Sequence, residues 1–184
     1  MSIKNLIKRF TKYELITGIL CILLPFILIA TNGGVLSSIS AYAYSTVDFI
    51  YVFLLTIAGT LITVVGVRQN KRLIWIIGIL LLFLPLTPYK DYKTIHLIAS
   101  ILFFIGISVD MIVDTQRLYQ YRIFMVVTMV LAFVSYYILH VISLFWAESI
   151  AIIIFGVNFL LDLLKEKEDL EDVDVMNITY GNNE

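Results

Sequence analysis

Four titratable side chains stand at the edges of apolar segments, and their types could carry chemistry. They are Asp48, His96, His140 and Glu148, and the chain contains no other histidine. Imidazole nitrogens and carboxylate oxygens are ligands for zinc, and they also form hydrogen bonds to polar ligands or to neighbouring helices. A stretch rich in hydroxyl groups, SSISAYAYSTVDF (37–49), includes the first of the four.

The composition places these groups in a membrane protein. Of the 184 residues, 60% are hydrophobic and only 15% are charged, whereas about 25% of the residues in a soluble domain are charged. A single water-soluble core of this size cannot hide so much apolar surface, so a bilayer must solvate it. The single cysteine, Cys21, excludes an intramolecular disulfide.

Six apolar segments are expected to form the transmembrane helices of an all-α bundle, because about 20 helical residues cross the hydrocarbon core. The third segment is short and has Pro85 near its end, but the long side chain of Arg72 can reach the interface and extend it. These helices form one transmembrane domain over residues 1–165. The predicted spans are 13–31, 47–67, 73–88, 94–113, 123–145 and 148–164.

The distribution of basic residues predicts the orientation. Eleven of the 13 Lys and Arg residues lie in the terminal segments and loops of one side, and the 32–46 loop of the other side has none. Both termini are therefore expected to be cytoplasmic, in a cell-membrane protein. Residues 166–184 are acidic and poor in apolar residues, so we expect a disordered tail. An acidic tail repels nucleic acid, and the expected partners are the bilayer, a lipid or another protein.

This topology gathers the polar residues on the outer side. The 37–49 stretch becomes the first external loop, His96 starts the fourth helix, and His140 lies about one turn before the end of the fifth. Ionisable groups inside a membrane are costly, so they usually face the bundle interior and are paired. We therefore predict an outward-facing polar pocket. Its residues are Ser38, Ser40, Tyr42, Asp48, His96, His140, Trp146 and Glu148.

The cluster has three interpretations. Asp48 and Glu148 can simply end their helices, because the helix dipole favours an anion at an N-terminus. The cluster can instead be a buried hydrogen-bonded group that fixes helix packing or receives a polar ligand. In the third interpretation, His96, His140 and Glu148 bind zinc, with an activated water as fourth ligand. No HxxxH or HExxH spacing holds the histidines in register for this third role.

Several short patterns resemble a bacterial family of six-pass membrane proteins without an assigned reaction. The segments that carry the resemblance are SISAYAYS, IIGILLLFLPLTP, IHLIASILFF and LFWAESIAIIIFGVNFL, within residues 37–160. That family is distantly similar to the DRAM-like proteins and faintly to seven-helix zinc hydrolases such as the alkaline ceramidases. Ala43 departs from the pattern, and the third histidine of those hydrolases has no counterpart. The pattern falls on Ser38, Ser40, Tyr42, Pro85, His96, Phe103, Phe104, Phe145, Trp146, Glu148, Phe155 and Gly156.

The leading expectation is a non-enzymatic multi-pass membrane protein that binds, senses or scaffolds through the outer pocket, without a cofactor. The alternative is a zinc-dependent membrane lipid hydrolase. A small-solute transporter is the third possibility, and its path would involve Asn158 or Asp162 of the sixth helix.

Overall fold

The computed structural model describes residues 3–113 and 119–180, and the side chains of residues 12–164 within those ranges. All regular structure in this part of the chain is helical, which fits an α-helical membrane bundle. The elements are α1 (Ile3–Asn32), a short 3₁₀ helix η1 (Ile39–Tyr44), α2 (Asp48–Arg68), α3 (Arg72–Leu86), α4 (Lys93–Val113), α5 (Tyr119–Tyr137) and α6 (Leu144–Tyr180).

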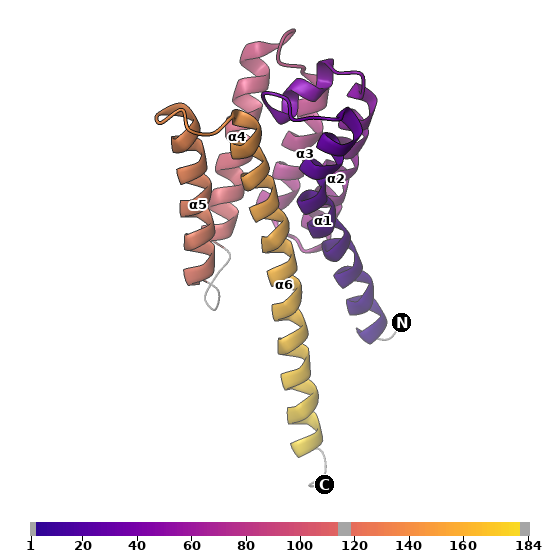
Figure 1. Ribbon diagram of the computed structural model, residues 1–184. Coiled ribbons are helices and arrows are strands. Elements are labelled where there is room, and N and C mark those ends of the chain that lie inside the picture. The colour runs from indigo at the N-terminus through magenta and orange to yellow at the C-terminus, as the bar shows by residue number, and fades with distance from the viewer. Residues whose placement is uncertain (1–2, 114–118, 181–184) are drawn as a thin grey trace.

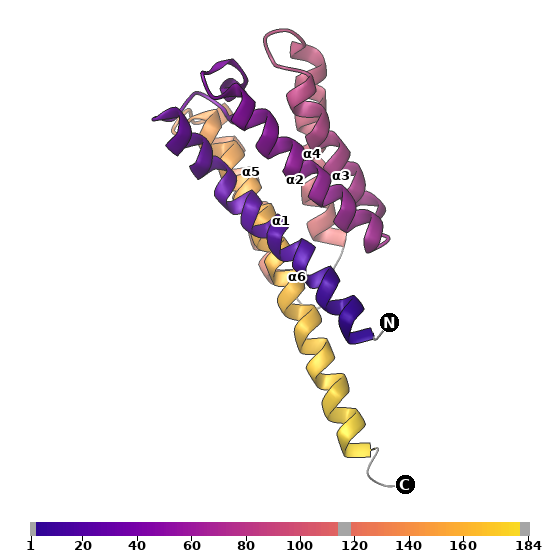
Figure 2. The ribbon, with the colours of Figure 1, turned by 90° about the vertical axis from the view of Figure 1, so that its right-hand side faces the viewer.

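The long helices form two layers of three (Figures 1 and 2). In one layer α3 lies between α2 and α4, and in the other α6 lies between α1 and α5. The layers pack closely along one edge, where α1 meets α2. They meet less extensively along the other edge, where α4 faces α5. The α4–α5 edge is therefore the more open side of the bundle.

Successive long helices run in opposite directions, so their loops gather at two ends (Figure 1). One end carries η1, the 87–92 loop and the 138–143 loop, and we call it the η1 end. The backbone N–H of Lys90 donates to the Tyr44 hydroxyl at 2.6 Å. The N–H of Phe145 donates to the Ser37 carbonyl at 3.0 Å. These bonds join the loop that contains η1 to the 87–92 loop and to the first turn of α6.

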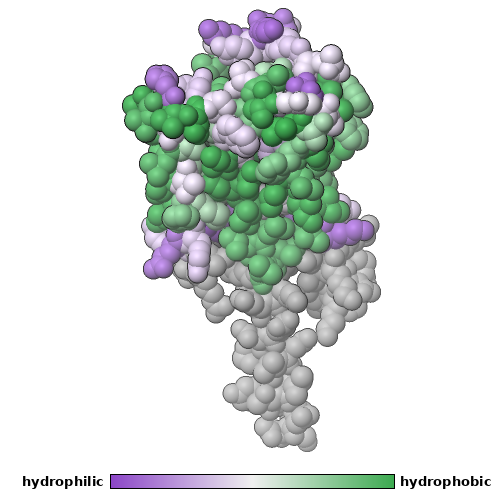
Figure 3. Space-filling model, viewed as in Figure 1, coloured by the Kyte–Doolittle hydropathy of each residue, from purple (hydrophilic) through white to green (hydrophobic). Residues whose placement is uncertain are grey.

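Among the residues that the structure describes, five helices are long and apolar enough to cross a membrane. They are residues 12–32 of α1, α2, α4, α5 and residues 144–164 of α6. Figure 3 shows the result on one face, where apolar side chains form a broad belt between two polar borders. The remaining helix, α3, has 15 residues and a length of about 22 Å at 1.5 Å per residue. It nevertheless runs between the same two ends as its neighbours (Figure 1).

Helices α2 and α3 pack closely because glycines face each other along their contact. A Cβ placed on Gly78 would lie 2.5 Å from the backbone nitrogen of Thr63, and one on Gly66 would lie 2.3 Å from the nitrogen of Trp75. Gly18 of α1 and Gly156 of α6 face each other in the same way. Small residues let membrane helices approach closely, where van der Waals packing stabilises them.

The end opposite η1 carries a group of charges that we call the Arg122 cluster, made of Lys71, Arg122 and Asp162. Arg122 of α5 is only 1% exposed and forms a hydrogen-bonded ion pair with Asp162 of α6. Lys71, between α2 and α3, lies 3.8 Å from the other carboxylate oxygen. The cluster therefore joins the two layers at this end.

The boundary between α5 and α6 differs from the sequence expectation, which places it near residues 145–148. The helix α5 ends at Tyr137, and α6 begins at Leu144. The N–H groups of Leu139 and Val141 bond back to the carbonyls of Val134 and Ser135. His140 has the left-handed φ of 52° that often follows a helix end. Because this connection is itself apolar, hydropathy alone does not separate it from the helix.

The backbone of α6 continues as one helix to Tyr180 and extends beyond the other helices (Figure 2). The acidic composition of residues 166–184 predicts a disordered tail, and most of these residues lie in this extension. A helix without tertiary packing is only marginally stable in water, so a helical backbone here does not contradict the prediction of a disordered tail. Disorder of the tail stays a prediction.

Candidate functional site

Part of the 37–49 stretch forms the 3₁₀ helix η1, and serine hydroxyl groups cap both of its ends. Ser38 is its N-cap, and its Oγ accepts a hydrogen bond from the Ala41 N–H at 3.1 Å. At the other end, the Ser45 hydroxyl donates to the Tyr42 carbonyl at 2.9 Å. Side chains that bond the backbone locally favour such short turns. Local capping thus accounts for part of the polarity of this stretch.

Tyr42 anchors η1 to the bundle. Its side chain is fully buried, its ring packs against Phe145 with centroids 6.0 Å apart, and its hydroxyl donates to the Gly34 carbonyl at 2.9 Å. Burial raises the pKa of the Tyr42 phenol, so the hydroxyl keeps its proton for that bond. Tyr42 therefore holds η1 in place against the bundle.

Glu148 connects η1 to α6. Its Oε2 accepts a hydrogen bond from the Ile39 N–H at 2.6 Å. The side chain lies on the second turn of α6 and is half-buried. Because α6 begins four residues earlier, Glu148 is not an N-terminal residue of its helix. Its carboxyl group instead closes the first turn of η1 and keeps further acceptor capacity, because a carboxylate has about four lone-pair positions.

His96 is fixed by the end of α3. It is 5% exposed, and its Nδ1 lies 2.7 Å from the Thr87 carbonyl oxygen. A carbonyl can only accept, so Nδ1 is the donor and Nε2 is the acceptor of the neutral ring. One turn further along α4, the Ser100 hydroxyl donates to the His96 carbonyl at 2.8 Å. The Ser100 oxygen can therefore accept from a ligand, but its proton is already used.

His96 and Glu148 line the same small cavity, which we call the recess. Its volume is about 30 Å³, enough for one or two water molecules. Tyr51 of α2, which is 1% exposed, and Phe103 also contribute. The recess is lined by Ile39, Ser40, Tyr51, Leu55, Leu81, Leu84, His96, Ser100, Phe103, Phe104, Glu148 and Ile152.

Two larger cavities continue from the recess. The first, which we call the chamber, has a volume of about 420 Å³ and shares Ser40, His96 and Glu148 with the recess. The second, the vestibule, has a volume of about 570 Å³, shares Ser40 with the chamber and is also lined by Lys90. The Lys90 ammonium lies 4.4 Å from the centre of the Tyr44 ring. A polar ligand could therefore extend from the vestibule to the recess.

The structure brings only some of the predicted pocket residues together. Ser40, His96 and Glu148 line the recess and the chamber, and Ser38 lines the vestibule. Asp48, His140 and Trp146 are exposed and line none of these three cavities. The Asp48 carboxylate accepts from the Phe49 N–H at 2.7 Å, in agreement with a role at the start of α2.

Several polar residues that line the cavities were not among the predicted pocket residues. Ser100 could have been found, because a residue four positions after His96 lies on the same helix face. The aromatic residues gave no such signal, since tyrosines near helix ends are also expected as interfacial anchors. The missed residues include Tyr51, Tyr89, Lys90, Ser100, Tyr136 and Tyr137.

The ligand set of the zinc interpretation is not assembled here. Within the part of the chain that the structure describes, no three His, Cys, Asp or Glu side chains gather closely enough to hold a metal ion. His96 and Glu148 supply two suitable donors at the recess. His140 lies in the exposed connection between α5 and α6, away from that cavity lining.

These features describe an α-helical membrane-bundle protein with a polar pocket at one end, whose lining includes His96 and Glu148. The chain belongs to a family of unknown function, DUF7103, whose model matches residues 23–163. This agrees with the expectation of a family without an assigned reaction. No curated protein and no solved structure matches the chain.

Proposed function

We propose that this is a non-enzymatic, six-pass cell-membrane protein that binds an amphipathic molecule through the η1-end site. The observation that carries the proposal is a group of three acceptors at the recess, beside the hydroxyl groups of Ser40 and Tyr51, which can donate or accept. Glu148, Nε2 of His96 and the Ser100 oxygen can all accept, while the Ser100 proton is already donated. A headgroup that donates hydrogen bonds complements this set, and an ammonium group also complements the charge of a carboxylate.

The size of the recess further limits which headgroups can bind. A recess of about 30 Å³ accommodates a group the size of one or two waters, which suits a primary ammonium or a hydroxyl but not a trimethylammonium. Lys90 at the vestibule supplies a cation for a phosphate further out along the same ligand. A phospholipid with an ethanolamine headgroup carries both groups.

The proposed topology has six passes, with both termini cytoplasmic and the η1 end outside. It is supported by the path of α3, which joins the same two ends as its neighbours. The 15 residues of α3 are short for a hydrocarbon core of about 30 Å, but Arg72 at its start can snorkel to the interface. The excess of Lys and Arg at the opposite end supports the orientation.

Binding is preferred here to zinc hydrolysis and to transport. Hydrolysis would need a third zinc ligand at the recess, and His140 is exposed elsewhere. A transport path along α6 would pass Asp162, which forms ion pairs with Arg122 and Lys71. Ligand binding uses the cavities without further rearrangement.

The test compares two phospholipids that differ only in the headgroup amine. The protein is reconstituted into vesicles of equal parts phosphatidylethanolamine and phosphatidylcholine with identical acyl chains. It is then extracted in mild detergent, and the retained lipid is quantified by mass spectrometry. We expect selective retention of phosphatidylethanolamine. Equal retention of the two lipids by the wild type would contradict the proposal.

Two carboxylate variants provide the matched comparison. Glu148→Gln keeps an oxygen for the Ile39 N–H but loses the charge, and we expect the preference to fall about tenfold or more, as for loss of a charged hydrogen bond. Asp48→Asn removes an exposed carboxylate at the same end that lines none of the three cavities. It should leave the preference unchanged.

A further inference from the structure

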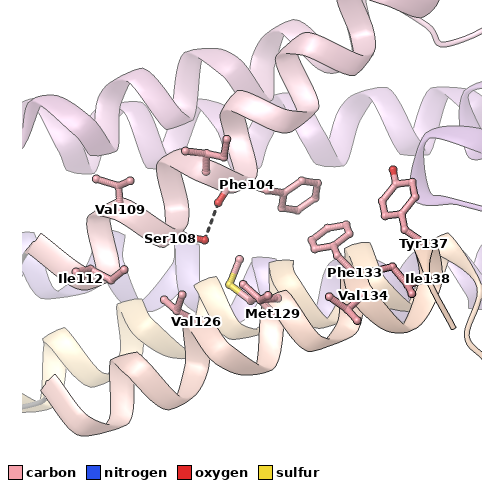
Figure 4. A pocket seen from close by; sticks show the side chains of 12 residues that line it. Phe104, Ser108, Val109, Ile112, Val126, Met129, Phe133, Val134, Tyr137 and Ile138 are labelled. Carbon is pink, nitrogen blue, oxygen red and sulfur yellow. Dashed lines mark hydrogen bonds between the residues drawn. The ribbon is translucent and has the colours of Figure 1, made fainter.

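The α4–α5 edge carries an apolar groove with a volume of about 460 Å³. Figure 4 shows side chains of both helices facing each other across it, including Val109, Ile112, Val126 and Met129. The hydroxyl of Ser108, the small residue near its middle, donates to the Phe104 carbonyl at 3.0 Å. The one serine in the lining thus offers the groove no free proton.

The groove is continuous with the polar site. It shares Phe104 and Ile105 of α4, and Phe133 and Tyr137 of α5, with the chamber. The chamber in turn shares His96 and Glu148 with the recess. An apolar channel therefore leads from the acceptor-lined recess along two membrane-spanning helices.

The groove is also open to the side. Ile105 and Val109 of α4 and Val130 of α5 are between 41% and 54% exposed. In a membrane this edge faces hydrocarbon, so an acyl chain can enter without crossing water. A protein helix is the other occupant that an apolar lining would suit, but the continuity of the groove with the chamber favours a molecule that carries a polar group at one end.

We propose that the groove holds one acyl chain of the bound amphiphile, which enters from the bilayer between α4 and α5. This inference rests on the proposed function and extends it to the apolar part of the ligand. From Val126 to Ile138 of α5 the groove is about 18 Å long at 1.5 Å per residue. Half of a hydrocarbon core of about 30 Å is similar in length. The length of the groove therefore matches the length of an acyl chain in one leaflet of the bilayer.

The test measures which acyl chains the protein retains. Vesicles contain phosphatidylethanolamines from dilauroyl to distearoyl in equal amounts, and the retained lipid is analysed after mild extraction. Val126→Phe narrows the end of the groove far from the recess, so retention of the longest chains should fall at least about fivefold relative to the shortest. Val127→Phe is the control, because Val127 is 48% exposed and lies outside the groove lining.

Ser108→Phe fills the middle of the groove and should lower retention of every chain length. One outcome would overturn the groove proposal alone. In it, the wild type prefers the ethanolamine headgroup and this preference depends on Glu148, but Val126→Phe and Ser108→Phe retain the same acyl chains as the wild type. If the wild type can be cross-linked as a dimer, and Ser108→Phe abolishes the dimer without changing the retained lipid, a second copy of the protein covers the groove. That result would also overturn the groove proposal. Absence of any headgroup preference in the wild type would overturn both proposals.

Discussion

The two ends of the bundle both bury polar side chains, but they use them differently. In the Arg122 cluster, Arg122 pairs directly with Asp162, and Lys71 approaches the same carboxylate. At the η1 end, His96 and Glu148 bond to backbone groups and still line a recess with space for another group. A buried polar residue therefore indicates a binding site only where hydrogen-bonding capacity and space remain together.

The largest effect should follow from breaking the Arg122 cluster. Arg122→Met leaves Asp162, whose side chain is 16% exposed, with Lys71 as the cation at 3.8 Å. Removing one partner of a buried ion pair costs about 3–5 kcal/mol of stability. We expect a marked fall in the thermal unfolding midpoint of the detergent-solubilised protein.

A double variant separates lost pairing from lost packing. Arg122→Met combined with Asp162→Leu removes both charges of the pair, and replacing a buried pair with apolar groups is often close to neutral. The double variant should recover most of the stability and retain phosphatidylethanolamine as the wild type does. If the double variant is no more stable than the single one, charge pairing is not what the cluster contributes.

A smaller effect is expected from the bond between Glu148 and η1. Glu148→Leu leaves the buried Ile39 N–H without its acceptor, which costs about 1–3 kcal/mol. Glu148→Gln keeps an oxygen at that position and should cost less than the Leu variant. Thermal unfolding of the two variants without added lipid measures the difference. Equal unfolding midpoints would mean that the bond does not hold η1 in place.

The smallest effect is expected at His140. Its φ of 52° is a left-handed conformation that costs about 1–2 kcal/mol for most residues with a side chain, and glycine adopts it freely. His140→Gly should therefore raise stability by up to about 1 kcal/mol and leave lipid retention unchanged. His140→Ala lacks this gain and serves as the control. Loss of lipid retention in His140→Gly would instead mean that His140 takes part in ligand binding.

The helical elements were largely predictable from the sequence, because five of the apolar segments in the described part of the chain have the length and composition of a membrane helix, and the sixth, α3, is apolar but shorter. The α5–α6 connection was not, since Ile138, Leu139 and Val141 are as apolar as the helices that they join. That single boundary moved His140 out of the predicted pocket and placed Glu148 in the second turn of α6.

The candidate site was predictable in part. His96 and Glu148 could be brought together from topology, because both precede or follow loops on the same side. The recess and the groove depend instead on how closely helices approach. Glycines close the α2–α3 contact, whereas bulky residues such as Phe104 and Phe133 meet at the α4–α5 edge. Sequence patterns give the face of a helix, but they do not give the distance to its neighbour.

A density map of the wild-type protein in nanodiscs of phosphatidylethanolamine tests the central claim most directly. We expect an elongated density with its polar end at the recess between His96 and Glu148 and its tail between α4 and α5. A recess that contains only solvent, with lipid confined to the outer surface of the bundle, would contradict the proposed binding site.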